Sequence, residues 1–163
     1  MATVSIEVDI SGILEQIQKI ENVPDAAERA MQQYINEDVY PAFMKTIETW
    51  DHKPNFDKSV KREGFNIVGE CSTDDDVYGW VNNGTSPHPI FAVKSERLHF
   101  QTGFTPKTKP RWIGSKSGGK SGDWVHPRSV QHPGIKDPRK FDETIANDTQ
   151  KLVVEKFKRE INL

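Results

Sequence analysis

The N-terminal part of the chain changes from a strand pattern to helix patterns. Apolar residues alternate with polar ones at Val4, Ile6, Val8 and Ile10. This alternation predicts a half-buried strand, so we expect residues 1–10 to form an N-terminal strand or arm. Ser11 then stands where its hydroxyl can cap a short helix that follows it.

A longer helix is predicted from Pro24 onward. Its apolar side chains recur mostly at intervals of three or four residues and are Ala27, Ala30, Met31, Tyr34, Ile35, Phe43, Met44, Ile47 and Trp50. Pro41 falls inside this pattern. Because proline lacks a backbone donor and crowds the preceding turn, we expect a kink or break near residues 38–40. The stripe is interpreted as the helix face that packs on a sheet.

From Phe56 onward the spacing becomes that of strands. Residues 59–65 and 66–72 predict two strands around Gly64. Residues 77–83, rich in β-branched and aromatic side chains, predict a third. The shorter predicted strands and extended segments are residues 90–93, 97–100 and 124–126.

Two tight turns punctuate this region. Asn83 and Gly84 both tolerate positive φ, which makes the pair a strong turn signal, and Pro133-Gly134 suits the centre of a type II turn. The residues expected to fix the backbone at these turns are Asn83, Gly84, Thr85, His88, Pro89, His132, Pro133 and Gly134. The acidic run at residues 73–76 is interpreted as a solvated hairpin tip, because it lacks the ligand spacing of a calcium loop.

Residues 103–123 form a long loop rich in Gly, Ser and Lys. Such a composition buries too little apolar surface to fold on itself, and loops of this length are usually functional or disordered. We therefore expect a flexible loop or arm, with Trp112 and Ile113 as its apolar anchor. Its candidate partner-contacting residues are Lys107, Lys109, Arg111, Trp112, Lys116 and Lys120.

The last predicted element is a helix over residues 137–161. Asp137 is placed as its N-cap and Pro138 as its first helical residue, where a missing donor does no harm. The order of elements indicates one α+β domain over residues 1–163. We expect a small antiparallel sheet packed by an N-terminal kinked helix and a C-terminal helix, with a long Gly/Ser/Lys-rich loop.

Composition indicates a small core. Apolar residues make up 34% of the 163-residue chain, below the usual share of globular domains even with glycine added. Long solvated loops, or stability gained in an assembly, would explain this. The single cysteine, Cys71, excludes an internal disulfide and fits a reducing compartment. Lacking a signal-peptide pattern and any membrane-spanning stretch, the chain is expected to be soluble and made in the cytosol.

Charge is unevenly distributed, although the net charge is −2. Residues 1–50 carry nine acidic and three basic side chains, whereas residues 103–128 carry six basic side chains and one acidic. A monomer with an acidic end and a basic loop can stack on copies of itself or on a complementary ring. The alternative is ordinary solvated charge that keeps the protein soluble.

Residues 114–121 match the phosphate-binding pattern G-x-x-x-x-G-K-S. A working P-loop needs a buried strand before the glycines and a helix that begins at the Lys-Ser pair. Here Pro110 lies before the first glycine and Pro127 lies soon after the serine, so neither element is expected. Nucleotide hydrolysis is therefore rejected.

No other enzymatic site is expected. The histidines that could invite a metal are His88, His99, His126 and His132. They lack helical spacing and suitably placed carboxylates, so they are interpreted as braces of turns. Cys71 follows Glu70, which raises the pKa of a thiol, and the clustered serines have no nearby base. We expect no enzyme activity, no metal and no cofactor.

The basic loop leaves two interpretations open. Its lysines and arginines, with Trp112 and Trp124 among them, could hold a phosphate backbone and stack on bases. The chain would then be a small nucleic-acid-binding module. Alternatively, the loop docks on an acidic protein surface, and composition does not separate the two.

An ordered set of short phrases resembles a known family. The phrases are Tyr78, Trp80, Asn83, Gly84 and Thr85, then His88 and Ile90, then Leu98 and Phe100, then Val130, His132, Pro133 and Gly134, then Arg139 and Phe141. In this order they resemble the head–tail joining, or tail-completion, proteins of long-tailed bacteriophages, which are neck proteins often grouped with minor tail components. The likeness covers the chain from about Pro24 onward, and residues 103–123 are an insertion relative to it. The expected packing anchors are Tyr78, Trp80, Phe100, Arg139 and Phe141.

The resemblance implies a non-enzymatic structural subunit that forms a ring, with six copies expected. Its expected neighbours are the head connector or adaptor protein on one side and the tail terminator or tail tube protein on the other. DNA would pass through the lumen without sequence-specific binding, and no membrane would be involved. The expected location is the head–tail interface of the virion, after assembly in the host cytoplasm. Since lumens of such rings tend to be acidic, residues 103–128 are expected to reach outward to a neighbour.

Overall fold

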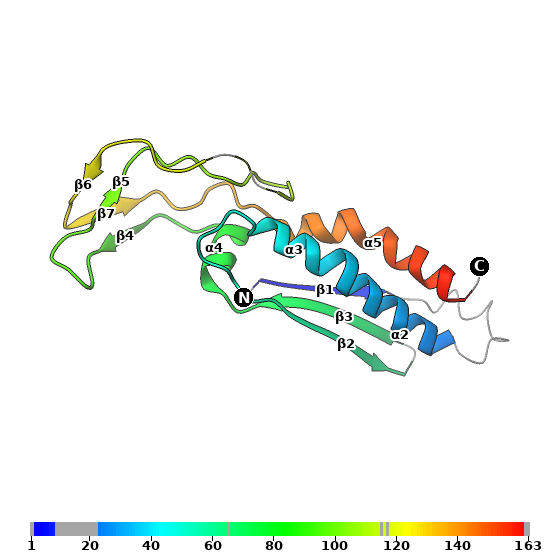
Figure 1. Cartoon of the computed structure of the whole chain (residues 1–163). Coiled ribbons are helices and arrows are strands. Elements are labelled where there is room, and N and C mark those ends of the chain that lie inside the picture. Colours follow the sequence, from blue (N-terminus) through cyan, green and yellow to red (C-terminus); the bar gives the residue numbers. More distant parts are fainter. Residues whose placement is uncertain (1, 9–22, 65, 115, 117, 162–163) are drawn as a thin grey trace.

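The computed structural model describes the whole chain except residues 1, 9–22, 65, 115, 117 and 162–163. The molecule is elongated (Figure 1). At one end helices pack on a sheet, and we call this part the body, which comprises the described residues within 1–84 and 138–163. At the other end a long antiparallel hairpin, which we call the ribbon, comprises residues 85–137. The short helix expected after Ser11 lies outside the described residues.

The predicted helix with a kink is confirmed. It consists of α2 (Val23–Tyr34), a π-helical turn η1 (Ile35–Val39) and α3 (Tyr40–Thr46). The wider π turn lies directly before Pro41, where a regular helix would need the donor that proline lacks. The predicted apolar stripe is buried along most of its length, but Met44 is 39% exposed because it lies on the outer face of α3.

The sheet of the body has three antiparallel strands in the order β1-β3-β2. They are β1 (Ala2–Val8), β2 (Asp57–Glu63) and β3 (Asn66–Thr73). Gly69 in β3 lies directly beneath α2 and η1, and a Cβ there would come within 2.6 Å of the Met31 sulfur. The glycine therefore lets the helix lie close to the sheet.

The third predicted strand is wrong, because residues 76–83 form helix α4 (Asp76–Asn83). The acidic run is not a hairpin tip either: Asp75 caps this helix and accepts a hydrogen bond from the Tyr78 amide at 2.8 Å. Gly84 ends the helix with φ 83°. Local β propensity was overridden by a strong N-cap and by burial of Tyr78 and Asn82, which lie one helical turn apart.

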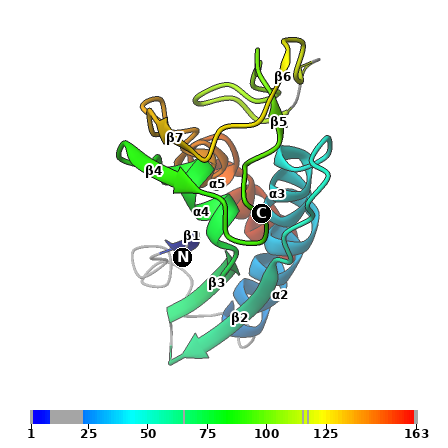
Figure 2. The ribbon, with the colours of Figure 1, turned by 90° about the vertical axis from the view of Figure 1, so that its left-hand side faces the viewer.

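The C-terminal helix begins later than predicted. Helix α5 (Phe141–Glu160) is preceded by Lys140 in a left-handed conformation, φ 53°. Asp137 is therefore not its N-cap, and Pro138 is not its first residue. α5 packs beside α2, and together they cover one face of the sheet (Figure 2). Lys156 of α5 pairs with two carboxylates of η1, Glu37 at 2.5 Å and Asp38 at 3.3 Å.

Aromatic side chains fill the end of the core nearest the ribbon. Tyr78 is fully buried, and its ring lies 5.0 Å from Phe56, 5.7 Å from Phe141 and 5.8 Å from Trp50. Phe43 completes this cluster at 5.0 Å from Phe56. Such contacts between rings stabilise a small core beyond the area they bury. The ribbon is thus rooted on the most densely aromatic part of the body.

The ribbon is one hairpin that folds back on itself. Near the body, β4 (His88–Phe91) pairs with β7 (Ser129–His132). Further along, β5 (Phe100–Gln101) pairs with β6 (Trp124–Val125), and Thr105 pairs with Gly119. Residues 92–99 form the turn at the far end, after which the hairpin returns toward the body (Figure 1). The strands predicted at residues 90–93 and 97–100 are therefore shifted.

Candidate functional site

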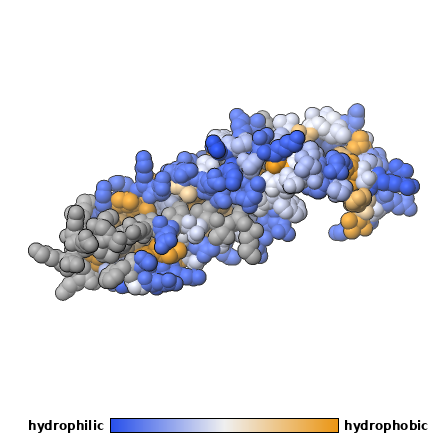
Figure 3. All heavy atoms as spheres, turned by 180° about the vertical axis from the view of Figure 1, so that it is seen from behind, coloured by the Kyte–Doolittle hydropathy of each residue, from blue (hydrophilic) through white to orange (hydrophobic). Residues whose placement is uncertain are grey.

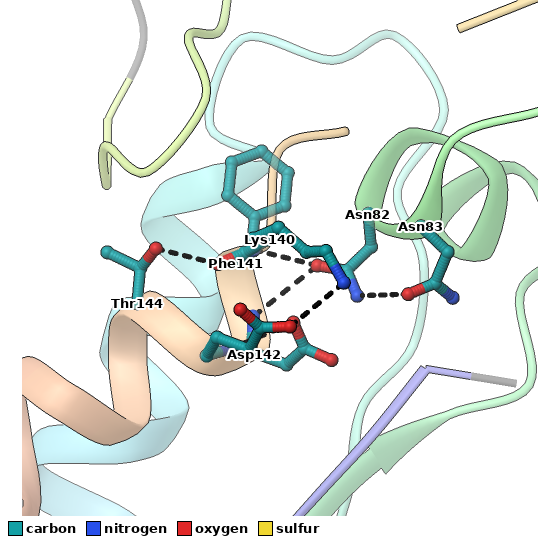
Figure 4. Close-up of polar contacts among 7 residues, drawn as sticks. Asn82, Asn83, Lys140, Phe141, Asp142 and Thr144 are labelled. Carbon is teal, nitrogen blue, oxygen red and sulfur yellow. Dashed lines mark hydrogen bonds and ion pairs between the residues drawn. The ribbon is translucent and has the colours of Figure 1, made fainter. Parts of the chain in front are cut away.

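The root of the ribbon is held by one buried amide, Asn82. Its Oδ1 accepts hydrogen bonds from the backbone amides of Phe141 at 2.7 Å and Asp142 at 3.4 Å, so Asn82 caps α5 from another element (Figure 4). Its Nδ2 donates to Asn83 Oδ1 at 3.0 Å. Its carbonyl accepts from the Lys140 amide at 3.1 Å. Asn82 thus ties the chain entering the ribbon to the chain leaving it.

The two turns predicted at Asn83-Gly84 and Pro133-Gly134 meet beside this amide. Thr85 and Ile135 exchange backbone hydrogen bonds of 3.3 and 3.0 Å, and the Ile135 amide also donates to Thr85 Oγ1 at 3.0 Å. Gly84 and Gly134 have φ of 83° and 76°. A Cβ on Gly84 would lie 2.6 Å from the Ile135 carbonyl oxygen, and one on Gly134 would lie 2.2 Å from that of Thr85. Both glycines are therefore required by conformation and by space.

Arg139 fastens the returning part of the ribbon to its root. Its Nη1 donates to the Asp137 carbonyl at 2.6 Å and its Nε donates to Thr108 Oγ1 at 3.1 Å. Its carbonyl accepts from the Arg111 amide at 2.8 Å. Lys107 adds a bond from Nζ to the Thr49 carbonyl at 3.0 Å. Residues 107–111 are thus fastened to the root and the body, whereas composition predicted a flexible loop or arm over residues 103–123.

The residues of this loop differ in their exposure. Thr108 and Gly114 are buried, and Ile113 packs against the core, whereas Trp112 remains 40% exposed over Gly114. Trp112 is thus not the apolar anchor that was expected. The exposed cations of this segment are Lys109, Arg111, Lys116 and Lys120. No helix follows Ser121, so residues 114–121 do not have the strand–loop–helix context of a P-loop.

Of the five expected packing anchors, Tyr78 and Phe141 are fully buried and Arg139 makes the contacts above. Phe100 is half-buried within the ribbon, while Trp80 is a correction. It is 53% exposed, because α4 turns its Tyr78 and Asn82 side inward and its Trp80 side to solvent. The helix period explains this, whereas a strand would have placed Tyr78 and Trp80 on the same face.

Histidines form two cross-strand pairs in the ribbon. His88 lies opposite His132, with ring centroids 5.0 Å apart. His99 Nδ1 lies 2.8 Å from His126 Nδ1, and the His99 ring stacks on Trp124 at 4.6 Å. Among the residues that the structure describes, no three His, Cys, Asp or Glu side chains converge as metal ligands would. The pairs brace the two strands against each other.

A groove of about 640 Å³ lies between the root of the ribbon, its returning part and the body. Its lining is largely apolar, with Trp50, Val77 and Val81 from the body and Phe104 and Ile135 from the ribbon. Charged and polar side chains that also line it are Asp51, His52, Lys107, Lys136, Asp137 and Arg139. An open apolar groove of this size suits a few side chains of another molecule.

The body side of this groove includes a histidine paired with a carboxylate. His52, which lines it, forms an ion pair with Asp75. Although burial acts to raise the pKa of Asp75, hydrogen bonds from His52 and the Tyr78 amide hold it below its usual value. Further carboxylates follow in the sequence around these positions, and they are exposed: Glu48, Asp51, Asp74 and Asp76. The lining of the groove itself carries Lys107, Lys136 and Arg139 against Asp51 and Asp137, so it is not negatively charged.

The ribbon and the body carry net charges of opposite sign. Residues 85–137 carry nine Lys or Arg and three Asp or Glu, a net +6, so the rest of the chain carries −8. Exposed large apolar side chains also gather on the ribbon, and they are Ile90, Phe91, Val93, Phe104, Trp112 and Trp124. Figure 3 shows a hydrophobic patch at the ribbon's far end. The ribbon thus has the character of an interaction surface.

Cys71 is buried in β3 beneath the helices. Burial, together with the nearby Asp57 and Glu70 carboxylates, raises the pKa of its thiol to about 11, although Lys58 opposes this. Such a thiol is neutral near pH 7 and has no thiolate to act as a nucleophile. Its surroundings identify it as a small core residue.

Compared with protein-family models, with curated proteins and with solved structures, the chain has no significant match to any of them. No helix in the described part of the chain has the length and apolar character needed to cross a membrane.

Proposed function

We propose that this chain is a structural subunit of the phage neck, a ring-forming tail-completion protein that joins the head connector to the tail. The observation that carries the proposal is the ribbon. About a third of the chain is committed to a basic, partly apolar projection that is fastened at its root and leaves large apolar side chains in solvent. Exposed apolar side chains on such a projection contribute a favourable free energy only when a neighbouring molecule buries them.

The phrases that resemble tail-completion proteins support the same function. Leu98 and Phe100 lie farther along the ribbon, but the phrases around Gly84 and Gly134 lie at its root, where Thr85 and Ile135 pair and Arg139 fastens the returning chain. In this position they fix the direction in which the ribbon leaves the body. These residues orient the ribbon, and they include no nucleophile or set of metal ligands. Such residues suit a structural subunit of an assembly.

The test is assembly of the particle. Particles made without this protein should accumulate as separate filled heads and tails, and adding the purified protein should restore joined, infectious particles. Electron microscopy and plaque counts measure both. Normal joining in the absence of the protein would reject the proposal.

A second candidate function is a small nucleic-acid-binding module. The observation that favours it is the exposed stack of Trp124, His99 and His126 on a ribbon of net +6. Flat rings beside cations can bind single-stranded nucleic acid. Measured binding to single-stranded DNA would then fall steeply between about 50 and about 200 mM salt. Replacing Trp124 with Ala would weaken it further, without affecting particle joining.

A further inference from the structure

Two histidines face each other where the ribbon turns back toward the body. Phe100 pairs with Val125 in the ladder of β5 and β6, so His99 and His126 lie directly opposite each other on the two strands. Their Nδ1 atoms are 2.8 Å apart, and both residues are exposed. Two imidazole nitrogens therefore converge on one point of the surface, near the end of the molecule that lies farthest from the body (Figure 1).

The two nitrogens share one proton. One Nδ1 must donate and the other accept, because two bare nitrogens at this distance would repel each other. A neutral imidazole can hold its single proton on either nitrogen. Since both rings are exposed, the shared proton can move to a solvated Nε2, which leaves two lone pairs directed at the same point. A metal ion can then replace the shared proton, and the neutral pair loses no proton in the exchange.

The distance between the two nitrogens indicates which metals fit. Two metal–nitrogen bonds of about 2.0 Å at a right angle span about 2.8 Å, and this angle belongs to square-planar and octahedral ions. Tetrahedral bonds of the same length span about 3.3 Å. The observed separation of 2.8 Å therefore matches neighbouring positions on Cu²⁺ or Ni²⁺ better than on tetrahedral Zn²⁺.

The charge around the pair excludes ions that proteins bind through oxygen. Arg97 Nη1 donates to the His126 carbonyl at 3.2 Å, and Arg128 is exposed two residues further on. Ca²⁺ and Mg²⁺ need carboxylate and carbonyl oxygens. Within the described part of the chain, no carboxylate joins the two histidines in a group of three ligands. In positive surroundings of this kind, a metal must be one that imidazole binds strongly, and Cu²⁺ stands highest in the order of affinities.

The other histidine pair of the ribbon does not have the same freedom. His132 Nδ1 accepts a hydrogen bond from the Gly134 amide at 3.1 Å. Ligation through its Nε2 would put the ring proton on Nδ1, directly against the proton of that amide. His88 Nδ1 is also engaged, since it donates to the Ser86 carbonyl at 2.9 Å. A metal at this pair would break a bond of the root, so this pair supplies a control.

We infer that His99 and His126 form a two-ligand site for a divalent transition metal, Cu²⁺ or Ni²⁺, with both Nδ1 atoms as ligands and water in the remaining positions. Such an open site differs from the three- and four-ligand sites that the sequence excluded. A bound ion would join the two strands at the point where the ribbon turns back. The inference goes beyond the proposed function and does not depend on it.

The test is a titration of untagged full-length protein, freed of metal by a chelator, with Cu²⁺, Ni²⁺ and Zn²⁺ in turn. Isothermal titration calorimetry measures the affinity and the number of ions bound. Cu²⁺ and Ni²⁺ should each bind more tightly than Zn²⁺. Cu²⁺ is paramagnetic, so at low ratios of metal to protein it should broaden the NMR signals of residues 97–101 and 124–128 before any others. Broadening centred elsewhere, or Zn²⁺ bound more tightly than Ni²⁺, would overturn the inference.

Substitutions test the two ligands one at a time. His99→Asn and His126→Asn each remove one imidazole but keep a side chain that can hydrogen-bond across the strands. Each should weaken Cu²⁺ binding by at least about ten-fold, since even the loss of a group that only orients a ligand costs this much. His88→Asn is the matched control and should leave the affinity unchanged. Equal affinity in wild type and His99→Asn, or equal losses in His99→Asn and His88→Asn, would overturn the inference.

The broadening in wild-type protein locates the ion without any substitution. The test therefore keeps its force even where an asparagine variant loosens the ribbon.

Discussion

Single buried polar groups determine how the ribbon meets the body. Asn82 is fully buried, and its side-chain oxygen satisfies amide donors at the start of α5 that would otherwise lack partners. The left-handed Lys140 places those donors toward it. Since Asn82 comes from α4, the cap is also a tertiary contact, and losing it should affect both helices.

Replacing Asn82 with Ala should lower the free energy of unfolding by about 1–3 kcal/mol, because two buried amides lose their acceptor. Urea denaturation measures this. Asn55→Ala is the matched control, because Asn55 is an exposed loop residue away from this hydrogen-bond network, and it should change stability by less than about 0.5 kcal/mol. Equal effects of the two substitutions would contradict the capping role.

Replacing Gly84 or Gly134 with Val should each destabilise the protein by about 1–3 kcal/mol or more. Both residues have positive φ, and a Cβ would clash with a backbone oxygen. Gly79→Ala is the opposite case, since it is helical and its Cβ would meet nothing within 4 Å. That substitution should stabilise the protein by up to about 1 kcal/mol. Wild-type melting temperatures in both valine variants would count against the backbone geometry described here.

Stability should decline as pH rises from about 9 to about 11, owing to Cys71. Its pKa is raised by folding from 9.0 to about 11, so between these values the unfolded state releases a proton that the folded state keeps. The stabilisation is complete below pH 9 and is lost as the folded thiol ionises. Chemical denaturation across this range measures it. Cys71→Ala should remove this part of the pH dependence, and an unchanged slope in that variant would contradict the assignment.

At the scale of elements, the periodic segments were the predictable ones. The kinked helix, the strands around Gly64 and the C-terminal helix follow from apolar spacing and proline placement. Helix α4 was not predictable in this way, because its β-branched and aromatic residues have strand propensity. Only Asp75 indicated the start of a helix. The start of α5 was also missed, since its cap is supplied from α4, and no local pattern reveals a cap from another element.

We expect the returning half of the ribbon to open locally more readily than the rest of the protein when its contacts are removed. Replacing Arg139 with Ala removes its bonds to Thr108 and to the Asp137 carbonyl, and amide exchange over residues 104–119 should accelerate by about ten-fold or more. Exchange in α2 and α5 should change little. Lys109→Ala, at an exposed position nearby, is the control. Uniform acceleration over the whole chain would show that Arg139 supports the body instead.

At the scale of the whole molecule, composition predicted a small core and a basic segment but not the shape of that segment. A lean core and a basic segment were visible in the sequence, and they correspond to the body and the ribbon. The hairpin was hidden because its pairing joins residues far apart, such as His88 with His132. A five-residue excursion at residues 93–97 also changes its register, which no short-range pattern can reveal.

The antiparallel ribbon gives the protein an adjustable reach. Two extra residues in each of its paired strands would lengthen it by about 7 Å while every side chain kept its face. The root at Thr85 and Ile135 and the packing of the body would be untouched. In the proposed ring, the reach of each subunit toward its neighbour would then change with the length of a single hairpin and independently of subunit stability.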